Sequence, residues 1–348
     1  MPSLSDAFKS VPVQCKEPDI SSMDEVPELY LWPQENQQAL EENIGVNIPV
    51  IDLQHGVTSR ASAGSVIELL RAAYEEFGVF QIVNHGVSQQ LLERVENQGR
   101  RLFSLPLDQK IKARRSPDGV TGYGMARICT FFDRLMWSEG FTSIGSPLEH
   151  AEKLWPDDYQ DFCETIDEYD HAMKDLASKL MSLILESLGL RQRDYSWGGD
   201  NCAALQMNHY PSCPRPAQTM GMAEHTDSTF LTVLYQGSVQ GLQIKRSDGM
   251  WTVVPAIPNA FVVNAGDLLQ VLSNGRYKSV VHRAVNSIKP RLSFAYLWGP
   301  PLTAVIEPAP QLVDSKHPLL YRALNWNEYL VVRAKHFDRA LEFFRNVQ

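Results

Sequence analysis

Apolar residues in the first half of the chain recur mostly at helical spacing. Between Val66 and Phe77 they return every three or four positions and stop at Gly78, which predicts a helix over 66–77. A second amphipathic stretch covers 88–104, and a longer apolar stripe over 159–183 steps by three and four in the same way. A stripe of this kind usually packs against a sheet. The first half is therefore predicted to be rich in helices.

From about residue 203 to 300 the pattern changes to short β-branched and aromatic runs separated by Gly, Pro and Asn. The runs are LTVLY, GLQIK, WTVVP, AFVVN, SVVHRAV and RLSFAYLW. Short strands that follow one another in this way predict a sandwich, barrel or jelly roll. Two further strand-like runs lie among the helices of the first half: IPVIDL precedes the helix over 66–77, and FGVFQIVNHG follows it. Helical spacing returns from Asn325.

We therefore expect an α+β protein. We divide it into an N-terminal extension (1–47), a helical N-terminal region (48–200), a β core (201–300) and a C-terminal helical segment packing on the core (301–348). A length of 348 residues allows two domains or one enlarged domain.

Charge and cysteine usage narrow the classes of function. With 41 acidic and 32 basic residues the net charge is −9, and no basic cluster favours nucleic acid or an anionic membrane. The five cysteines are scattered without a C-x-x-C pair, and the N-terminus lacks a signal-peptide pattern. We expect a cytoplasmic protein with reduced thiols and no nucleic-acid or membrane partner; the oligomeric state stays open.

One candidate for chemistry is His225-Thr226-Asp227, just before the run LTVLY. If this segment is extended, its first and third side chains share a face and can converge on one ion. A second H-x-D, at His336 and Asp338, falls in the predicted C-terminal helix. Residues two apart on a helix diverge around the axis, so we interpret that copy as a solvated helix face.

His282, within SVVHRAV, adds a second imidazole to the first copy. A histidine in such a strand is more often structural than a ligand. Two imidazoles and one carboxylate nevertheless make the facial triad typical of non-haem Fe(II), and the same set also accepts Zn(II), Co(II) or Mn(II).

Arg291 and Ser293 come on the next predicted strand and share one face of it. A guanidinium with an adjacent hydroxyl can bind a carboxylate through a bidentate fork and a third donor. Upstream, Asn208 and Tyr210 belong to the motif N-H-Y-P.

The order N-x-Y-P, H-x-D, His, R-x-S resembles the plant soluble Fe(II)/2-oxoglutarate-dependent dioxygenases over 48–345. The resemblance implies a double-stranded β-helix (jelly-roll) core, and Fe(II), 2-oxoglutarate, molecular oxygen and supporting ascorbate as cofactors. It implies that His225, Asp227 and His282 hold Fe(II). Arg291, Ser293 and Tyr210 would bind the distal carboxylate of 2-oxoglutarate, with Asn208 near its chelating end. No further catalytic acid or base is expected, and we interpret His85 and His209 as structural.

The segment 115–155 is similar to the gibberellin 3-oxidases in its runs RSPDGVTGYGMARI, FF, MWSEGF, GSPL and LWP. This resemblance implies 3β-hydroxylation of nineteen-carbon gibberellin precursors, which are rigid diterpenoid carboxylic acids. For such a substrate we predict aromatic walls from Tyr123, Phe132 and Trp137 and an anion partner in Arg127, with Arg134 as its competitor. Glu139 would order the pocket or pair with an arginine.

Departures from the gibberellin 3-oxidase pattern at Cys129-Thr130 and Asp133-Arg134 leave the regiochemistry open. The alternatives are a gibberellin oxidase with other or multiple regiochemistry (2-oxidation or desaturation), a flavonoid-type dioxygenase and a zinc hydrolase. A catalytically silent, ligand-binding relative of the fold is the non-enzymatic alternative.

Overall fold

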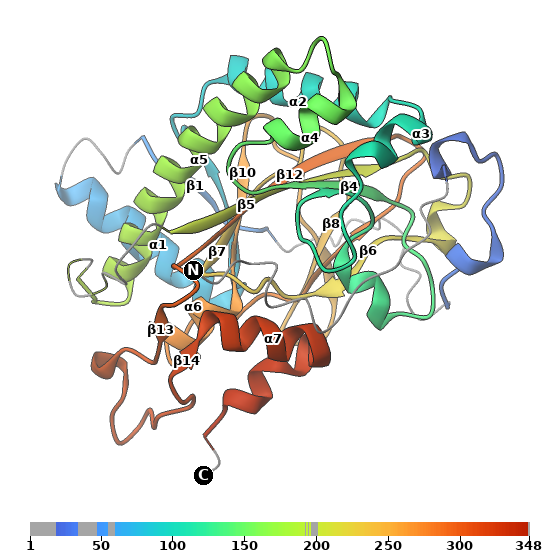
Figure 1. The fold of residues 1–348 in the computed structure, drawn as a ribbon. Coiled ribbons are helices and arrows are strands. Elements are labelled where there is room, and N and C mark those ends of the chain that lie inside the picture. Colours follow the sequence, from blue (N-terminus) through green and yellow to red (C-terminus); the bar gives the residue numbers. More distant parts are fainter. Residues whose placement is uncertain are drawn as a thin grey trace.

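The computed structural model describes residues 19–33, 47–54, 60–191, 193, 195 and 201–346. The fold within these ranges is α+β, as predicted, with helices on both sides of a strand-rich centre (Figure 1). The helices are α1 (Arg60–Glu76), α2 (Gln89–Phe103), α3 (Leu107–Lys110), α4 (Leu148–Leu154), α5 (Gln160–Ser187), α6 (Asp267–Leu272) and α7 (Trp326–His336). The strands are β1 (Val50–Asp52), β2 (Val79–Val83), β3 (Gly122–Tyr123), β4 (Glu139–Ser143), β5 (Cys202–Tyr210), β6 (Met220–His225), β7 (Leu231–Tyr235), β8 (Leu242–Lys245), β9 (Trp251–Val253), β10 (Phe261–Ala265), β11 (His282–Val285), β12 (Arg291–Gly299), β13 (Val305–Ile306) and β14 (Leu324–Asn325).

Two sheets form the jelly-roll core. The larger has eight strands in the order β1-β2-β10-β7-β12-β5-β4-β3, and the smaller has four in the order β6-β11-β8-β9. Both sheets contribute to the lining of one cavity, so that cavity lies between them. Each apolar run predicted over 203–300 corresponds to one of these strands.

Helices α2 and α5 cover the large sheet at the top of Figure 1. Helix α5 is 28 residues long and buries Phe162, Met173 and Leu180 completely, which confirms the long apolar stripe. Helix α2 begins after Ser88, whose hydroxyl accepts from the backbone N–H of Leu91 at 3.2 Å. That bond satisfies one of the orphan donors at the helix start.

Gly78 ends α1 as the sequence predicts. Its φ is +68°, and a Cβ atom there would lie 2.7 Å from the carbonyl oxygen of Lys278. A side chain would meet both backbone strain and a clash, so this turn into β2 needs glycine.

The region before residue 201 supplies more of the core than its helical pattern indicates. Strands β1 to β4 all belong to the large sheet, and β4 was not predicted. Its sequence EGFTS is buried at every position although most of its side chains are polar, so it carries no apolar alternation. Pairing between β4 and β5, not hydrophobicity, defines this strand.

The interpretation of His336 and Asp338 as one helix face is wrong in detail. Helix α7 ends at His336, and Phe337 has a φ of +49° before a 3-10 helix begins. The buried ring of Phe337 stacks on Phe131 with centroids 4.8 Å apart, which holds the chain at this break. His336 and Asp338 are exposed on either side of it.

Cys129, Cys163, Cys202 and Cys213 are not joined in disulfides, and Cys15 lies outside the described residues. None of the helices within the described ranges is long and apolar enough to cross a membrane.

Candidate active site

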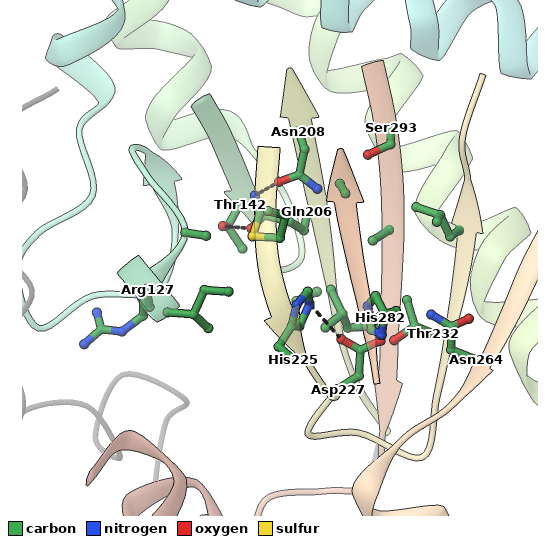
Figure 2. A pocket seen from close by; sticks show the side chains of 18 of the residues that line it. Arg127, Thr142, Gln206, Asn208, His225, Asp227, Thr232, Asn264, His282 and Ser293 are labelled. Atoms are coloured by element: carbon green, nitrogen blue, oxygen red, sulfur yellow. Dashed lines mark hydrogen bonds and ion pairs between the residues drawn. The ribbon is translucent and has the colours of Figure 1, made fainter. Parts of the chain in front are cut away.

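A cavity of about 290 Å³ lies between the two sheets and brings together most of the predicted site residues (Figure 2). Among those that line it are Asn208, Tyr210, His225, Asp227, His282, Arg291, Ser293 and Arg127. They come from β5, β6, β11 and β12, from the turn after β6 and from the segment that follows β3. Strands far apart in sequence thus present one set of polar groups to a single space.

His225, Asp227 and His282 form the one group of metal-ligand type found among the described residues, and we call it the His-Asp-His triad. One ligand atom from each lies within 4.8 Å of the others. The Nε2 atoms of His225 and His282 are each 3.8 Å from a carboxylate oxygen of Asp227. His282 pairs with His225 across β11 and β6, so sheet register fixes the two imidazoles side by side.

Asp227 reaches the triad by a route that differs from the prediction. Strand β6 ends at His225, so Thr226 and Asp227 are not part of the extended strand on which their convergence was predicted. The carbonyl oxygen of Asp227 instead accepts from the backbone N–H of Asp267 at 2.8 Å. A turn anchored to the start of α6 therefore directs the carboxylate.

The ring orientation of both histidines is set by the backbone. Nδ1 of His225 lies 2.8 Å from the carbonyl oxygen of Ala223, and Nδ1 of His282 lies 3.1 Å from that of Val280. A carbonyl can only accept, so each Nδ1 carries the proton and each Nε2 keeps its lone pair for a ligand.

Electrostatics keep the triad in its ligating protonation state. Burial, together with neighbouring His282, lowers the pKa of His225 to about 3. Burial alone would raise the pKa of Asp227, but His282 and His225 lower it overall. His225 therefore offers a neutral imidazole and Asp227 an ionised carboxylate at neutral pH.

The triad also contains a carboxylate oxygen that could accept a bond from a cation. Oδ2 of Asp227 is buried without a hydrogen-bond partner among the described residues. An unpaired buried carboxylate oxygen is costly. Two imidazole nitrogens and one carboxylate fit Fe(II), and this donor set also accepts Zn(II), Co(II) or Mn(II).

Arg291 lines the same cavity and is 4% exposed. Its Nε donates to the carbonyl oxygen of Val239 at 3.1 Å, and its guanidinium lies 4.9 Å from the ring centre of Tyr210. Burial lowers its pKa, and Nη1 has no partner within the part of the chain that the structure describes. Such a cation beside the hydroxyl of Ser293 fits an incoming carboxylate.

Comparison with known proteins agrees with this arrangement. Residues 201–300 match the family model of the 2OG-Fe(II) oxygenase superfamily, and residues 48–158 match that of the non-haem dioxygenase in morphine synthesis N-terminal region. Gibberellin 3-beta-dioxygenase 1 of Pisum sativum is 47% identical over 99% of this chain and 94% of its own length. This chain belongs to the 2OG-Fe(II) oxygenase superfamily.

Other members of the superfamily share its sequence and fold. Gibberellin 3-beta-dioxygenase 2 of Arabidopsis thaliana is 45% identical over 99% of both chains. The crystal structure of JOX2 in complex with 2OG, Fe and JA has a TM-score of 0.80 at 30% identity and covers 94% of this chain and 96% of its own. The rice dioxygenase for auxin oxidation has a TM-score of 0.73 at 28% identity over 86% of this chain and all of its own. The family resemblance and the jelly-roll fold are thereby confirmed.

Two arginines were candidates for an anion partner in this oxygenase, and only Arg127 lines the cavity. Its Nη1 donates to the carbonyl oxygens of Pro117 and Gly119, and Figure 2 shows its guanidinium directed away from the triad. Nη1 of Arg134 donates to the carbonyl oxygen of Glu28, and Arg134 is not part of the cavity lining.

The predicted aromatic walls lie outside the cavity lining of the oxygenase. Trp137 is completely buried against Tyr30, with its Nε1 donating to the carbonyl oxygen of Ser212. Phe132 packs between Trp32 and Phe337, one layer behind the cavity. The lining at this end consists instead of smaller side chains, namely Val120, Ala126 and Ile128.

Tyr123 and Glu139 belong to a separate buried network. The Tyr123 hydroxyl and the Lys110 ammonium each donate to Oε2 of Glu139 at 2.6 Å. Nδ1 of His209 lies 2.8 Å from Oε1 of the same carboxylate. His209 sits between Asn208 and Tyr210 on β5, so this network fixes the strand from behind. His85 is also remote from the cavity, with Nε2 2.8 Å from the carbonyl oxygen of Asn259.

Replacing Glu139 by glutamine is expected to lower the free energy of unfolding by about 3 kcal/mol at neutral pH, because it leaves Lys110 buried without its counter-charge. Burial raises the pKa of Glu139, but the bonds from His209 and Lys110 lower it below its ordinary 4.5. A depressed folded-state pKa stabilises above the unfolded value and loses that contribution as the pH falls.

Urea unfolding of Glu139→Gln should therefore differ most from the wild type near pH 7, and the difference should narrow as wild-type Glu139 becomes protonated in acid. Glu149→Gln is the matched control, since its partner Lys153 is exposed. An equal loss in both variants, or a difference that grows in acid, would contradict the assignment of this network.

Several cavity residues were missed in the sequence. Gln206 lies two residues before Asn208 on β5, so strand alternation alone indicates that they share a face. Thr142 pairs with Gln206 from the unpredicted strand β4, and no sequence signal marks it. Asn264 and Thr232 are cross-strand partners on β10 and β7, hidden within apolar runs.

Proposed function

We propose that this oxygenase 3β-hydroxylates nineteen-carbon gibberellin precursors, with oxidative decarboxylation of 2-oxoglutarate to succinate and carbon dioxide. The observation that carries the proposal is the identity of 47% to a gibberellin 3-beta-dioxygenase over 99% of this chain. One cavity that combines a metal-ligand triad with a buried arginine whose Nη1 has no partner among the described residues supports the same reaction class.

In this proposal His225, Asp227 and His282 hold Fe(II), with one face of the ion left for 2-oxoglutarate and oxygen. Bound iron supplies the oxidation chemistry, in which 2-oxoglutarate and molecular oxygen generate the oxidant for an unactivated C–H bond. In this reaction the protein needs no side-chain acid or base for hydrogen abstraction.

The chain's own task is to bind and orient the two organic substrates. Arg291 and Ser293 would receive the distal carboxylate of 2-oxoglutarate, with Tyr210 packed over the guanidinium and Asn208 nearer the chelating end. Met222, Leu234, Leu242 and Leu297 give much of the remaining lining an apolar character. A rigid diterpenoid skeleton fits such a wall, because its burial removes apolar surface from water without loss of internal freedom.

We place the substrate carboxylate toward Arg127, which lines the cavity together with Arg115 on the segment that resembles gibberellin 3-oxidases. Arg127→Gln is expected to raise the KM for the gibberellin roughly tenfold, equivalent to about 1.4 kcal/mol, with the KM for 2-oxoglutarate unchanged. Arg134→Gln, outside the cavity, should leave both constants at their wild-type values. Steady-state kinetics with each substrate varied in turn provide the measurement, and equal effects in the two variants would refute this placement.

The proposed activity is tested by incubating the protein with gibberellin precursors, Fe(II), 2-oxoglutarate and ascorbate, followed by mass spectrometry of the products. A 3-hydroxylated gibberellin as main product supports the proposal. A 2-hydroxylated or desaturated product would replace it with other regiochemistry, and turnover of a flavonoid alone would replace the substrate class. Turnover without oxygen would indicate a hydrolase, and binding without succinate formation a silent relative.

We also propose a cytoplasmic, small-molecule enzyme that uses ascorbate to keep its iron reduced. Two observations support this setting. The net charge of −9 does not favour nucleic acid or an anionic membrane surface, and the cysteines of the described ranges form no disulfide, which does not favour an oxidising compartment.

A further inference from the structure

The C-terminal helix reaches the turn that carries Asp227. Arg333 of α7 lines the same cavity as the His-Asp-His triad, and its side chain is 12% exposed. It comes more than a hundred residues after the H-x-D motif and belongs to none of the motifs found in the sequence. Burial of a guanidinium is costly unless its donors are satisfied, so the partners of Arg333 must explain its place here.

The donors of Arg333 are directed to the residue between two triad members. Nη2 donates to the carbonyl oxygen of Thr226, and Nη1 donates to the Thr226 hydroxyl at 3.1 Å. Nη1 also lies 2.8 Å from Oδ2 of Asp267. The planar guanidinium of Arg333 thus bonds to both the backbone and the side chain of Thr226.

Asp267 closes the arrangement from the opposite side. Its Oδ2 accepts from the hydroxyls of Thr226 and Tyr329, while its backbone N–H donates to the carbonyl oxygen of Asp227 at 2.8 Å. Arg333 and Asp267 therefore bond to two successive backbone carbonyls, those of Thr226 and Asp227. Tyr329 in turn bonds to the carboxylate of Asp267.

Backbone packing leaves the turn little room to adapt by itself. A Cβ atom on Gly266 would lie 2.1 Å from the carbonyl oxygen of Thr229 and 3.2 Å from that of Asp227. Trp326, at the start of α7, donates from Nε1 to the carbonyl oxygen of Ser228 at 2.9 Å. The C-terminal helix thus bonds to the chain on either side of Asp227.

We propose that Arg333 is a positioning residue for the metal site: it holds Thr226 so that the ligand atoms of His225 and Asp227 stay within reach of one ion. This rests on the proposed metal-binding role of the triad. Partners that orient metal ligands typically change metal affinity by about 10- to 100-fold when they are removed.

The test is titration of the metal-free protein with Co(II), monitored by calorimetry and by the visible spectrum of the bound ion. Co(II) is used in place of Fe(II) because it does not oxidise in air. Arg333→Met should weaken Co(II) binding about tenfold or more and alter the spectrum. Arg333→Lys keeps the charge beside Asp267 but lacks the planar fork, so it should fold with near wild-type stability and still bind Co(II) more weakly.

Leu330→Ala is the matched control, because Leu330 is a buried residue of α7 that makes no contact with the turn through hydrogen bonds. It should lower the melting temperature and leave Co(II) affinity unchanged. Wild-type Co(II) affinity in both Arg333 variants would overturn the positioning role. A loss of Co(II) affinity no larger than that caused by Leu330→Ala would overturn it too. A higher KM for the gibberellin with unchanged Co(II) affinity would overturn it as well. Failure of the wild type to bind Co(II) would instead overturn the proposed metal site itself.

Discussion

Asp227→Ala will abolish both turnover and metal binding. The substitution removes the only anionic ligand of the His-Asp-His triad and leaves two neutral imidazoles, which hold a divalent ion weakly. Fe(II) or Co(II) should raise the melting temperature of the wild type, because a ligand that binds only the folded state stabilises it, and should leave that of the variant unchanged. Succinate formation should fall below detection.

The chain contains its own control for this substitution. His336 belongs to the second H-x-D, is exposed and packs only its ring against Phe343 at 4.2 Å. His336→Ala should retain the turnover and the metal-induced rise in melting temperature of the wild type. If Asp227→Ala kept either property, the carboxylate would have no place in the metal site.

Arg291→Met will weaken 2-oxoglutarate binding more than any other substitution in the cavity wall. Loss of a buried, hydrogen-bonded charge partner costs about 2–5 kcal/mol, which corresponds to a rise of at least roughly thirtyfold in the KM for 2-oxoglutarate. The ligand-free protein should not lose stability, because Arg291 is buried, burial lowers its pKa, and its Nη1 has no partner among the described residues. Methionine removes that desolvation cost.

A higher KM for 2-oxoglutarate without a loss of stability distinguishes a role of Arg291 in cosubstrate binding from a role in folding. Steady-state kinetics give the KM for 2-oxoglutarate, and thermal unfolding without ligand gives the stability. Arg276→Met, which breaks an exposed pair with Glu75, is the control and should change neither quantity. A lower melting temperature of Arg291→Met with an unchanged KM would assign Arg291 to the fold and not to the cosubstrate.

The sequence predicted the elements with strong periodicity. Helix α5 and strands β7 to β12 followed from apolar spacing, because each buries one regular face or run. Strand β4 did not, since Glu139, Thr142 and Ser143 are buried polar residues whose partners lie on other elements. Buried polar strands are stabilised by hydrogen bonds that only the tertiary structure brings together.

Whether a predicted site residue reaches the cavity also depends on the regularity of the element that carries it. Motifs on regular strands, such as Arg291 and Ser293, reach the cavity because alternation determines their direction. Trp137 lies in an irregular segment and Tyr123 on the two-residue strand β3, which is too short to show alternation in the sequence. Both point into other parts of the core. Arg333 enters from a helix far along the chain, so only the packing of α7 shows its relation to Thr226.

The proposed reaction is tested most directly by incubation with a nineteen-carbon gibberellin precursor under ¹⁸O₂, with both products analysed. A 2-oxoglutarate-coupled 3β-hydroxylation predicts one labelled oxygen in a new 3-hydroxyl group, one in succinate, and equal amounts of the two products. Succinate without a 3-hydroxylated gibberellin, or a 3-hydroxyl oxygen derived from water, would contradict it.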